Sequence, residues 1–157
     1  VQHFNAIQYD AARRLFNKSL DYPLNNVYAA LAHYWLAEIA YREDDFDGAL
    51  IEIGKFEATP GSATLSEYKR SLYNKGYAYF SKEDYRNAAT TFRLFLNSAK
   101  LGTKLANDAE LRLADSYFMT AQYANAITYY TTYLGPMKTA RSSPQKKRSS
   151  TPLPPSS

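Results

Sequence analysis

The sequence predicts an all-α fold, a solenoid of antiparallel helix pairs. Three observations lead to this prediction: apolar residues recur at helical spacing, one helical segment returns along the chain, and no stretch alternates as a strand does. At 157 residues the chain can form one domain or a short repeat array. We favour the array, because each repeat needs its neighbours to bury its apolar face.

The repeated segment begins with an aromatic residue and has an alanine three residues later. Its first residues are Tyr9, Phe46, Tyr85 and Tyr123, so the steps between repeats are 37, 39 and 38 residues. The alanines are Ala12, Ala49, Ala88 and Ala126. A large apolar residue follows each alanine by four positions, at Phe16, Ile53, Phe92 and Tyr130. A register kept this closely indicates a repeated structural unit.

A second helical segment precedes three of these segments and has a small residue of its own. The small residues are Ala37, Gly76 and Ala114. Two antiparallel helices approach closely only where side chains are short, and large neighbours then fill the grooves between them. We therefore expect each repeat to be a helix, a short turn and a second helix, with the small residues at the contact.

Helix-ending residues separate the first three predicted helices. Pro23 ends the first helix and can open the second at its first turn. The stretch Glu43–Gly48 forms the turn before the third helix, where its acids can cap the helix and favour its positive end. Thr59-Pro60-Gly61 then stops the third helix.

Further signals place the remaining helices. Thr64 and Glu67 have the spacing of a capping box before the fourth helix, and Gly102 is placed to end the fifth. Seven helices result, or about three and a half repeats. The predicted helices span residues 4–20, 24–42, 46–58, 64–81, 85–99, 104–119 and 123–134.

The composition changes after Gly135-Pro136. Residues 137–157 are rich in Ser, Pro, Lys and Arg and lack apolar periodicity. We therefore place the helical domain in residues 1–136 and predict a disordered tail over 137–157, either native or a foreign end. Lys146–Arg148 could serve as a nuclear-import or polyanion-binding patch, but a solvated tail is the reading we favour.

The positive net charge of the chain comes from this tail. Without it, 14 Lys and Arg stand against 15 Asp and Glu, so the folded body is close to neutral. We therefore do not expect the body to bind nucleic acid. The chain has no cysteine and no apolar run of about 18 residues, so we expect neither disulfides nor a membrane span.

No catalytic, metal or cofactor site is expected. His3 and His33 lie in different repeats, and neither has a Ser, Cys or acid arranged with it as in a catalytic triad. The stretch Glu43–Gly48 imitates the first half of a calcium loop, but Gly54 stands where that loop needs a bidentate glutamate. Helix capping is the simpler explanation of its acids, and we predict that the chain is not an enzyme.

The repeats resemble the tetratricopeptide repeat family over residues 4–134. The resemblance rests on the period and on Leu36-Ala37, Gly76, Tyr79, Ala88, Phe92, Leu113-Ala114, Tyr117, Ala126 and Tyr130. Three features depart from the family: the period exceeds the usual length of about 34, Ala40 stands where a tyrosine is expected, and the proline that ends each unit is largely missing. The resemblance implies a right-handed superhelix whose first helices line a concave groove.

Long repeats with this second-helix pattern are most similar to tetratricopeptide proteins of the Gram-negative envelope. Those include the Tol-Pal-associated protein and the lipoprotein of the outer-membrane assembly machine. The resemblance therefore implies a bacterial protein in the periplasm or attached to the envelope.

The implied function is a scaffold that binds a protein or peptide in the groove. Tyr and Arg are enriched at binding hot spots, and the first helices carry several of each. The candidate groove residues are Tyr34, Glu38, Tyr41, Arg42, Arg70, Tyr73, Asn74, Tyr77, Phe80, Leu111, Arg112, Asp115 and Phe118. Half of the aromatic residues could instead fill the space between helices.

An alternative function is an interaction or assembly domain of a larger envelope complex, or of an enzyme whose catalytic part lies outside this chain. We also expect the array to be a fragment of a longer one. Tyr129, Tyr130 and Tyr133 crowd the last helix, and repeat arrays normally finish with a polar terminal helix. Self-association through this end is the expected consequence.

Overall fold

The computed structural model describes residues 2–21, 25–100 and 102–140, and the side chains of residues 6–21, 25–100 and 102–132. In this part of the chain there are seven α-helices and a short 3-10 helix, and no strand. The helices fall into two compact units, of which the first ends at Ala78 and the second begins at Tyr79. The prediction of an all-α helical repeat is confirmed.

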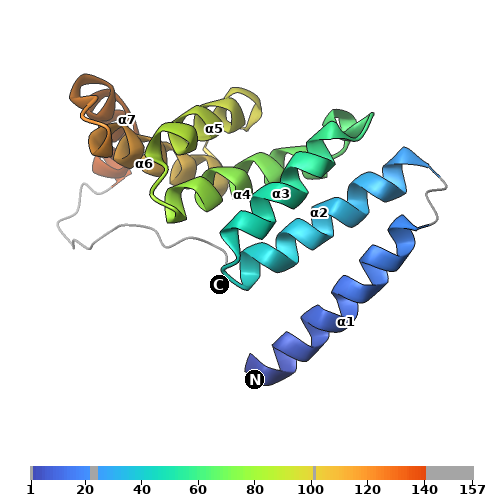
Figure 1. The fold of residues 1–157 in the computed structure, drawn as a ribbon. Coiled ribbons are helices and arrows are strands. Elements are labelled where there is room, and N and C mark those ends of the chain that lie inside the picture. Colours follow the sequence, from blue (N-terminus) through green and yellow to red (C-terminus); the bar gives the residue numbers. More distant parts are fainter. Residues whose placement is uncertain (1, 22–24, 101, 141–157) are drawn as a thin grey trace. The chain divides into compact units, whose positions relative to one another are not determined.

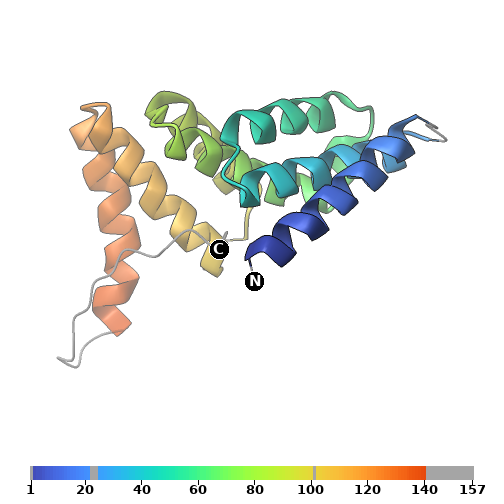
Figure 2. The same cartoon turned by 60° about the horizontal axis from the view of Figure 1, so that its bottom comes forward.

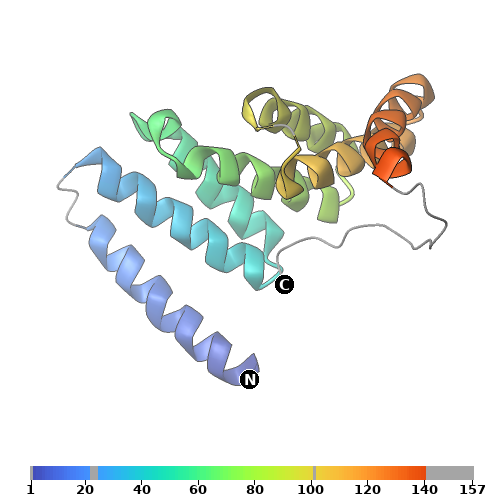
Figure 3. The same cartoon turned by 180° about the vertical axis from the view of Figure 1, so that it is seen from behind.

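The first unit is a helical hairpin with one further helix beside it and another beginning within it. It contains α1 (Gln2–Leu20), α2 (Asn26–Arg42), α3 (Phe46–Ala58), the 3-10 helix η1 (Ser62–Thr64) and most of α4 (Glu67–Ser81). The helices α2 and α3 form the antiparallel hairpin, and α1 lies alongside α2 (Figures 1 and 3).

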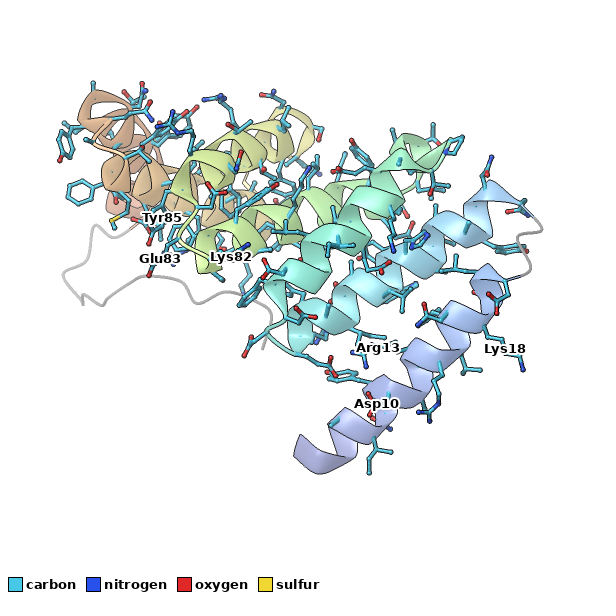
Figure 4. The ribbon with its side chains drawn as sticks, viewed as in Figure 1. Asp10, Arg13, Lys18, Lys82, Glu83 and Tyr85 are labelled. Carbon is cyan, nitrogen blue, oxygen red and sulfur yellow. The ribbon has the colours of Figure 1, made fainter. Side chains whose placement is uncertain are left out.

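Polar and aromatic contacts hold the first unit together. Arg13 of α1 donates to Asp10 of the same helix at 2.8 Å (Figure 4). Arg13 also pairs with Glu43, the residue after α2. At the other end of the hairpin, fully buried Phe56 packs against Tyr34 of α2 and against Tyr68 of α4. The core of this unit therefore contains residues from both helices of the hairpin and from α4.

The second unit contains the end of α4 followed by three helices. These are α5 (Tyr85–Ser98), α6 (Lys104–Met119) and α7 (Tyr123–Ala140). The helix α6 contacts α5 on one side and pairs with α7 on the other (Figure 2). The α6–α7 pair is an antiparallel hairpin like that of α2 and α3.

Burial of the small residues agrees with the predicted close contacts in the last three repeats, whereas Ala12 in the first is only partly buried. Ala49 and Ala88 are 0% exposed and Ala126 is 2% exposed. The large residues four positions later are also buried in the two middle repeats, at Ile53 and Phe92. The small side chains therefore let each second helix approach its neighbours, and the large ones fill the space beside them.

The turn between paired helices has the same backbone in all three repeats. Glu83 lies in the α4–α5 turn (Figure 4). Its φ is 62°. The N–H of Asp84 donates to the carbonyl of Tyr79 at 2.9 Å, and the Asp84 carboxylate then accepts from the N–H of Asn87. Asp44 and Ala121 occupy the same position in the other turns and have the same φ. This arrangement satisfies the last carbonyls of one helix and the first N–H groups of the next.

An aromatic pair spans each of these turns. We call these the turn pairs: Tyr41–Phe46, Phe80–Tyr85 and Phe118–Tyr123, with ring centroids 5.8, 5.3 and 5.4 Å apart. All three pairs meet edge to face, the arrangement that aromatic rings prefer. The turn pairs therefore fix the angle at which the chain leaves one helix and enters the next.

The predicted end of the last helix is wrong. The helix α7 continues through Gly135 and Pro136 to Ala140, so residues 137–140 are not part of a disordered tail. A proline inside a helix removes one hydrogen bond and crowds the carbonyl four residues earlier. Pro136 imposes this cost on α7 without ending the helix. The remaining tail, residues 141–157, lies outside the described residues, and so do Pro23 and the side chains of His3 and Tyr133.

Two predicted helix ends are also wrong. Thr64 does not cap α4, because it lies in η1 and its hydroxyl donates to the carbonyl of Gly61. Gly102 does not end α5, which ends at Ser98. Gly102 lies in the loop before α6 and has a φ of 85°. In the same loop the Thr103 hydroxyl accepts from the N–H of Ala106. Both corrections have the same cause. Thr64 and Gly102 are residue types that suit a helix end, but here each lies in the segment that connects two helices.

Replacing Ala88 with a larger residue is expected to destabilise the protein. The side chain is fully buried at the helix contact, so Ala88→Leu should cost about 1–3 kcal/mol in overpacking. The measurement is chemical denaturation of this variant beside Thr90→Leu, a change at an exposed position of the same helix. Equal loss of stability in the two variants would contradict the close-contact assignment.

Glycine is expected to stabilise the last turn. Alanine in the left-handed region costs about 1–2 kcal/mol, and the entropy that glycine loses on folding offsets only part of the gain. Ala121→Gly should therefore raise the free energy of unfolding by up to about 1 kcal/mol. Ala11→Gly, inside α1, should instead lower it. A loss of stability in both variants would show that the turn carries no such strain.

Candidate functional site

The thirteen predicted groove residues fall into three classes of exposure. Buried are Tyr34, Glu38, Tyr41, Tyr73, Asn74, Tyr77, Leu111 and Arg112. Partly buried are Arg70, Phe80 and Asp115, and exposed are Arg42 and Phe118. Tyr73 and Tyr77 are each 1% exposed and are among the largest fully buried side chains. These two tyrosines belong to the core and present no surface to a partner, which corrects their assignment to the groove.

In the first unit, four of these residues form one polar network between α2 and α4. We call Glu38, Arg42, Arg70 and Asn74 the Glu38 network. The Asn74 amide donates to one carboxylate oxygen of Glu38 at 2.8 Å, and Arg42 donates to the other at 3.0 Å. Arg70 donates to the Asn74 carbonyl at 3.5 Å. Glu38 and Asn74 are buried, while both arginines retain contact with solvent.

The Glu38 network fixes the positions of two guanidinium groups. Both the Nε and an Nη of Arg42 lie close to the same Glu38 oxygen, at 3.0 and 2.9 Å. Arg70 is also placed by the ring of Tyr73, whose centroid lies 5.8 Å from its guanidinium carbon. Charge-assisted hydrogen bonds of this kind are stronger than neutral ones. The surface of α2 and α4 therefore presents two held cations above a buried carboxylate.

Aromatic side chains of α2 lie next to this network. Tyr34 is buried, and burial is the main cause that raises its pKa to about 12, with the Glu38 carboxylate adding to the effect. The rings of Tyr34 and Trp35 pack edge to face, with their centroids 4.9 Å apart. Trp35 is 43% exposed and stands one helical turn before Glu38. The sequence prediction did not include Trp35, although tryptophan is among the residue types enriched at hot spots.

In the second unit the predicted residues form a different polar group. Arg112 is 7% exposed and lies 2.7 Å from an Asp115 oxygen and 4.0 Å from an Asp108 oxygen. The Tyr130 hydroxyl donates to Asp115. Burial and this hydrogen bond raise the pKa of Tyr130 above its ordinary value. Since Arg112 also lies over the ring of Phe80, we assign it to the interior of this unit and not to an exposed contact surface.

The other chemical candidates have structural roles. The Nδ1 of His33 lies 2.8 Å from a Glu52 oxygen of α3, so this histidine bridges the hairpin. Asp45 caps α3 by accepting from the N–H of Gly48. Among the described residues, no group of three or more His, Cys, Asp or Glu could hold a metal ion. No helix described here is long and apolar enough to cross a bilayer.

The family is decided by comparison with known repeats. The tetratricopeptide repeat family model matches residues 3–63 and 73–145, which together make up most of the chain. The chain belongs to the tetratricopeptide repeat family. A search of the curated proteins finds no match. Tetratricopeptide repeats are generally protein–protein interaction modules, in agreement with the expected binding scaffold.

The residues that carry the family likeness hold this tetratricopeptide domain together. Most are buried, including Leu36-Ala37 at the first hairpin and Leu113-Ala114 at the last. Family membership therefore accounts for the packing and the turns. The Glu38 network and Trp35 are not among the residues that carry the family likeness.

The titration of Tyr34 should reveal its burial. Its pKa of about 12 lies above the ordinary 10.0 because the folded state favours the neutral phenol. The stability that this shift contributes is fully present below pH 10 and is lost as the pH rises towards 12. Alkaline difference spectroscopy of the protein against Tyr34→Phe should therefore show a phenol that ionises above pH 10. Ionisation of Tyr34 near 10 would contradict the buried placement.

Proposed function

We propose that this protein is a non-enzymatic scaffold that binds a peptide segment of a partner protein on the α2–α4 surface of its first unit. The observation that supports the proposal is the Glu38 network, which holds Arg42 and Arg70 in place while leaving them accessible. Arginine side chains that are already positioned lose less conformational freedom when they bind. They therefore suit a contact surface better than free surface cations.

The chemistry of this surface indicates the kind of segment. Trp35, Glu38 and Arg42 follow one another at three and four residues, so they lie along one face of α2. The exposed Trp35 ring suits an apolar side chain, and the guanidinium of Arg42 suits an acidic one. We propose a segment with both features, extended or helical, and not a purely anionic ligand, since buried Glu38 opposes high negative charge.

The setting of the scaffold is a second part of the proposal. The length of the repeats and the second-helix pattern beginning at Tyr123 are similar to those of tetratricopeptide proteins of the Gram-negative envelope. We propose that the domain serves in assembly of an envelope complex, in the periplasm or attached to a membrane. Fractionation of the source cells with an antibody against this chain tests the location. Recovery in the cytosolic fraction would refute it.

The binding surface is tested with a peptide selected from a random displayed library on the unmodified protein. Trp35→Ala, Arg42→Ala and Arg70→Ala should each weaken the selected peptide by about 1–4 kcal/mol if they are hot spots. That loss corresponds to a Kd raised roughly fivefold or more. Titration calorimetry measures the Kd, and circular dichroism confirms that helicity is kept.

The matched control for this experiment is Arg86→Ala, which removes one exposed cation from α5 in the second unit. Thr90→Ala is a neutral control at an exposed position of that helix. Neither change should alter the Kd. If the arginine variants bind the selected peptide as tightly as the two controls do, the α2–α4 surface is not the site.

A further inference from the structure

The last hairpin exposes apolar residues that the first hairpin covers. In the first turn pair Tyr41 is 5% exposed, whereas its counterpart Phe118 is 52% exposed. The second member changes in the same direction, from partly buried Phe46 to Tyr123 at 54%. The turn geometry is the same in both hairpins, so the difference lies in what covers them.

The exposed surface continues along α7. Ile127 stands one helical turn after Tyr123 and is 63% exposed, and Met119 at the end of α6 is 55% exposed. The counterpart of Ile127 in the first hairpin, Leu50, is partly buried. We call Phe118, Met119, Tyr123 and Ile127 the α6–α7 patch. The rings of Phe118 and Tyr123 are in contact, and exposed groups of large apolar side chains mark interaction sites.

This patch also lacks charge. No residue between Asp115 and Lys138 is charged, although this stretch contains the α6–α7 turn and most of α7. The other second helices carry charges at exposed positions, such as Asp47 and Lys55 on α3 and Arg86 on α5. A helix whose outer face is meant for water normally carries charges there. The outer face of α7 therefore has the composition of an interface.

We propose that the α6–α7 patch binds the same patch of a second copy of this chain, making a two-fold symmetric dimer. A two-fold contact places each residue on its axis opposite its own copy, so any charge near the axis would face a like charge. The patch carries none, and its apolar side chains and rings can pack against themselves. Exposed Asn125 and Thr128 beside it can act as both donors and acceptors, which suits hydrogen bonding to identical residues.

Two other occupants fit this surface less well. The exposed apolar residues of α1 in a second copy, Ile7 and Leu15, lie beside exposed Arg14 and Lys18. A head-to-tail contact would bring these cations against a surface that offers no acid, and desolvation without a partner is costly. A segment recognised by its charge would likewise find nothing complementary on this patch.

The experiment is sedimentation velocity over a range of concentrations, with the full chain. The unmodified protein should approach a dimer as concentration rises. Ile127→Glu and Ile127→Lys should each raise the dimer Kd at least tenfold, because both copies then bring the same charge to the contact. Ile51→Glu is the matched control, since Ile51 is an isoleucine of similar exposure, 58% against 63%, on the second helix α3. It should leave the dimer unchanged.

Mixing the two charged variants tests the symmetry. Ile127→Glu and Ile127→Lys, combined in equal amounts, should recover the dimer, since a two-fold contact then sets opposite charges against each other. Three outcomes would overturn the proposal: a monomer at all concentrations, association that grows without limit as a head-to-tail contact would, or a dimer equally weakened by Ile51→Glu. Circular dichroism of each variant shows that helicity is preserved, so loss of the dimer cannot be attributed to unfolding.

Discussion

Where paired helices meet, Ala49, Ala88 and Ala126 leave almost no space between one backbone and the neighbouring side chains. Close packing at these points determines which residues must be large, because Ile53 and Phe92 occupy the volume beside the contact. It also requires the turn to return the chain at one angle. The left-handed residue and the turn pair meet that requirement in all three turns, and an aspartate cap is added before α3 and α5.

Much of the fold follows from the sequence because its cause is local. The alanines recur at one register, and a buried small residue between large ones has few explanations other than helix contact. Helix ends were harder to predict. Gly102 and Thr64 are residue types that suit a helix end, yet they act in the connections, because capping depends on which hydrogen bonds the loop leaves unpaired. The proline at position 136 likewise predicted a helix end that does not occur, since the loss of one hydrogen bond did not end α7.

The site was less predictable, because a periodic pattern shows which residues share a helix face but not which of them are covered. Tyr73 and Tyr77 share a face with Asn74 within about one turn, yet all three are buried. Aromatic residues that recur at matching positions suggest a groove. Here they recur mainly because they pack between helices or form the turn pairs. An aromatic on each side of every turn, as in Phe80 and Tyr85, was the available signal for that role. The exposure of Trp35 and the hydrogen bond from Asn74 to Glu38 could not be predicted from the sequence. Trp35 carries no periodic signature, and Glu38 and Asn74 come from separate repeats.

The turns have a consequence for how the chain folds. Each hairpin closes through bonds between residues only a few positions apart, as in the bond from the Gln122 N–H to the Tyr117 carbonyl. Contacts between residues near in sequence form early, since little chain entropy is lost in closing so short a loop. The α2–α3 turn can therefore close before the later helices have been synthesised, whereas stable burial of the hairpin's apolar face still requires the neighbouring helices.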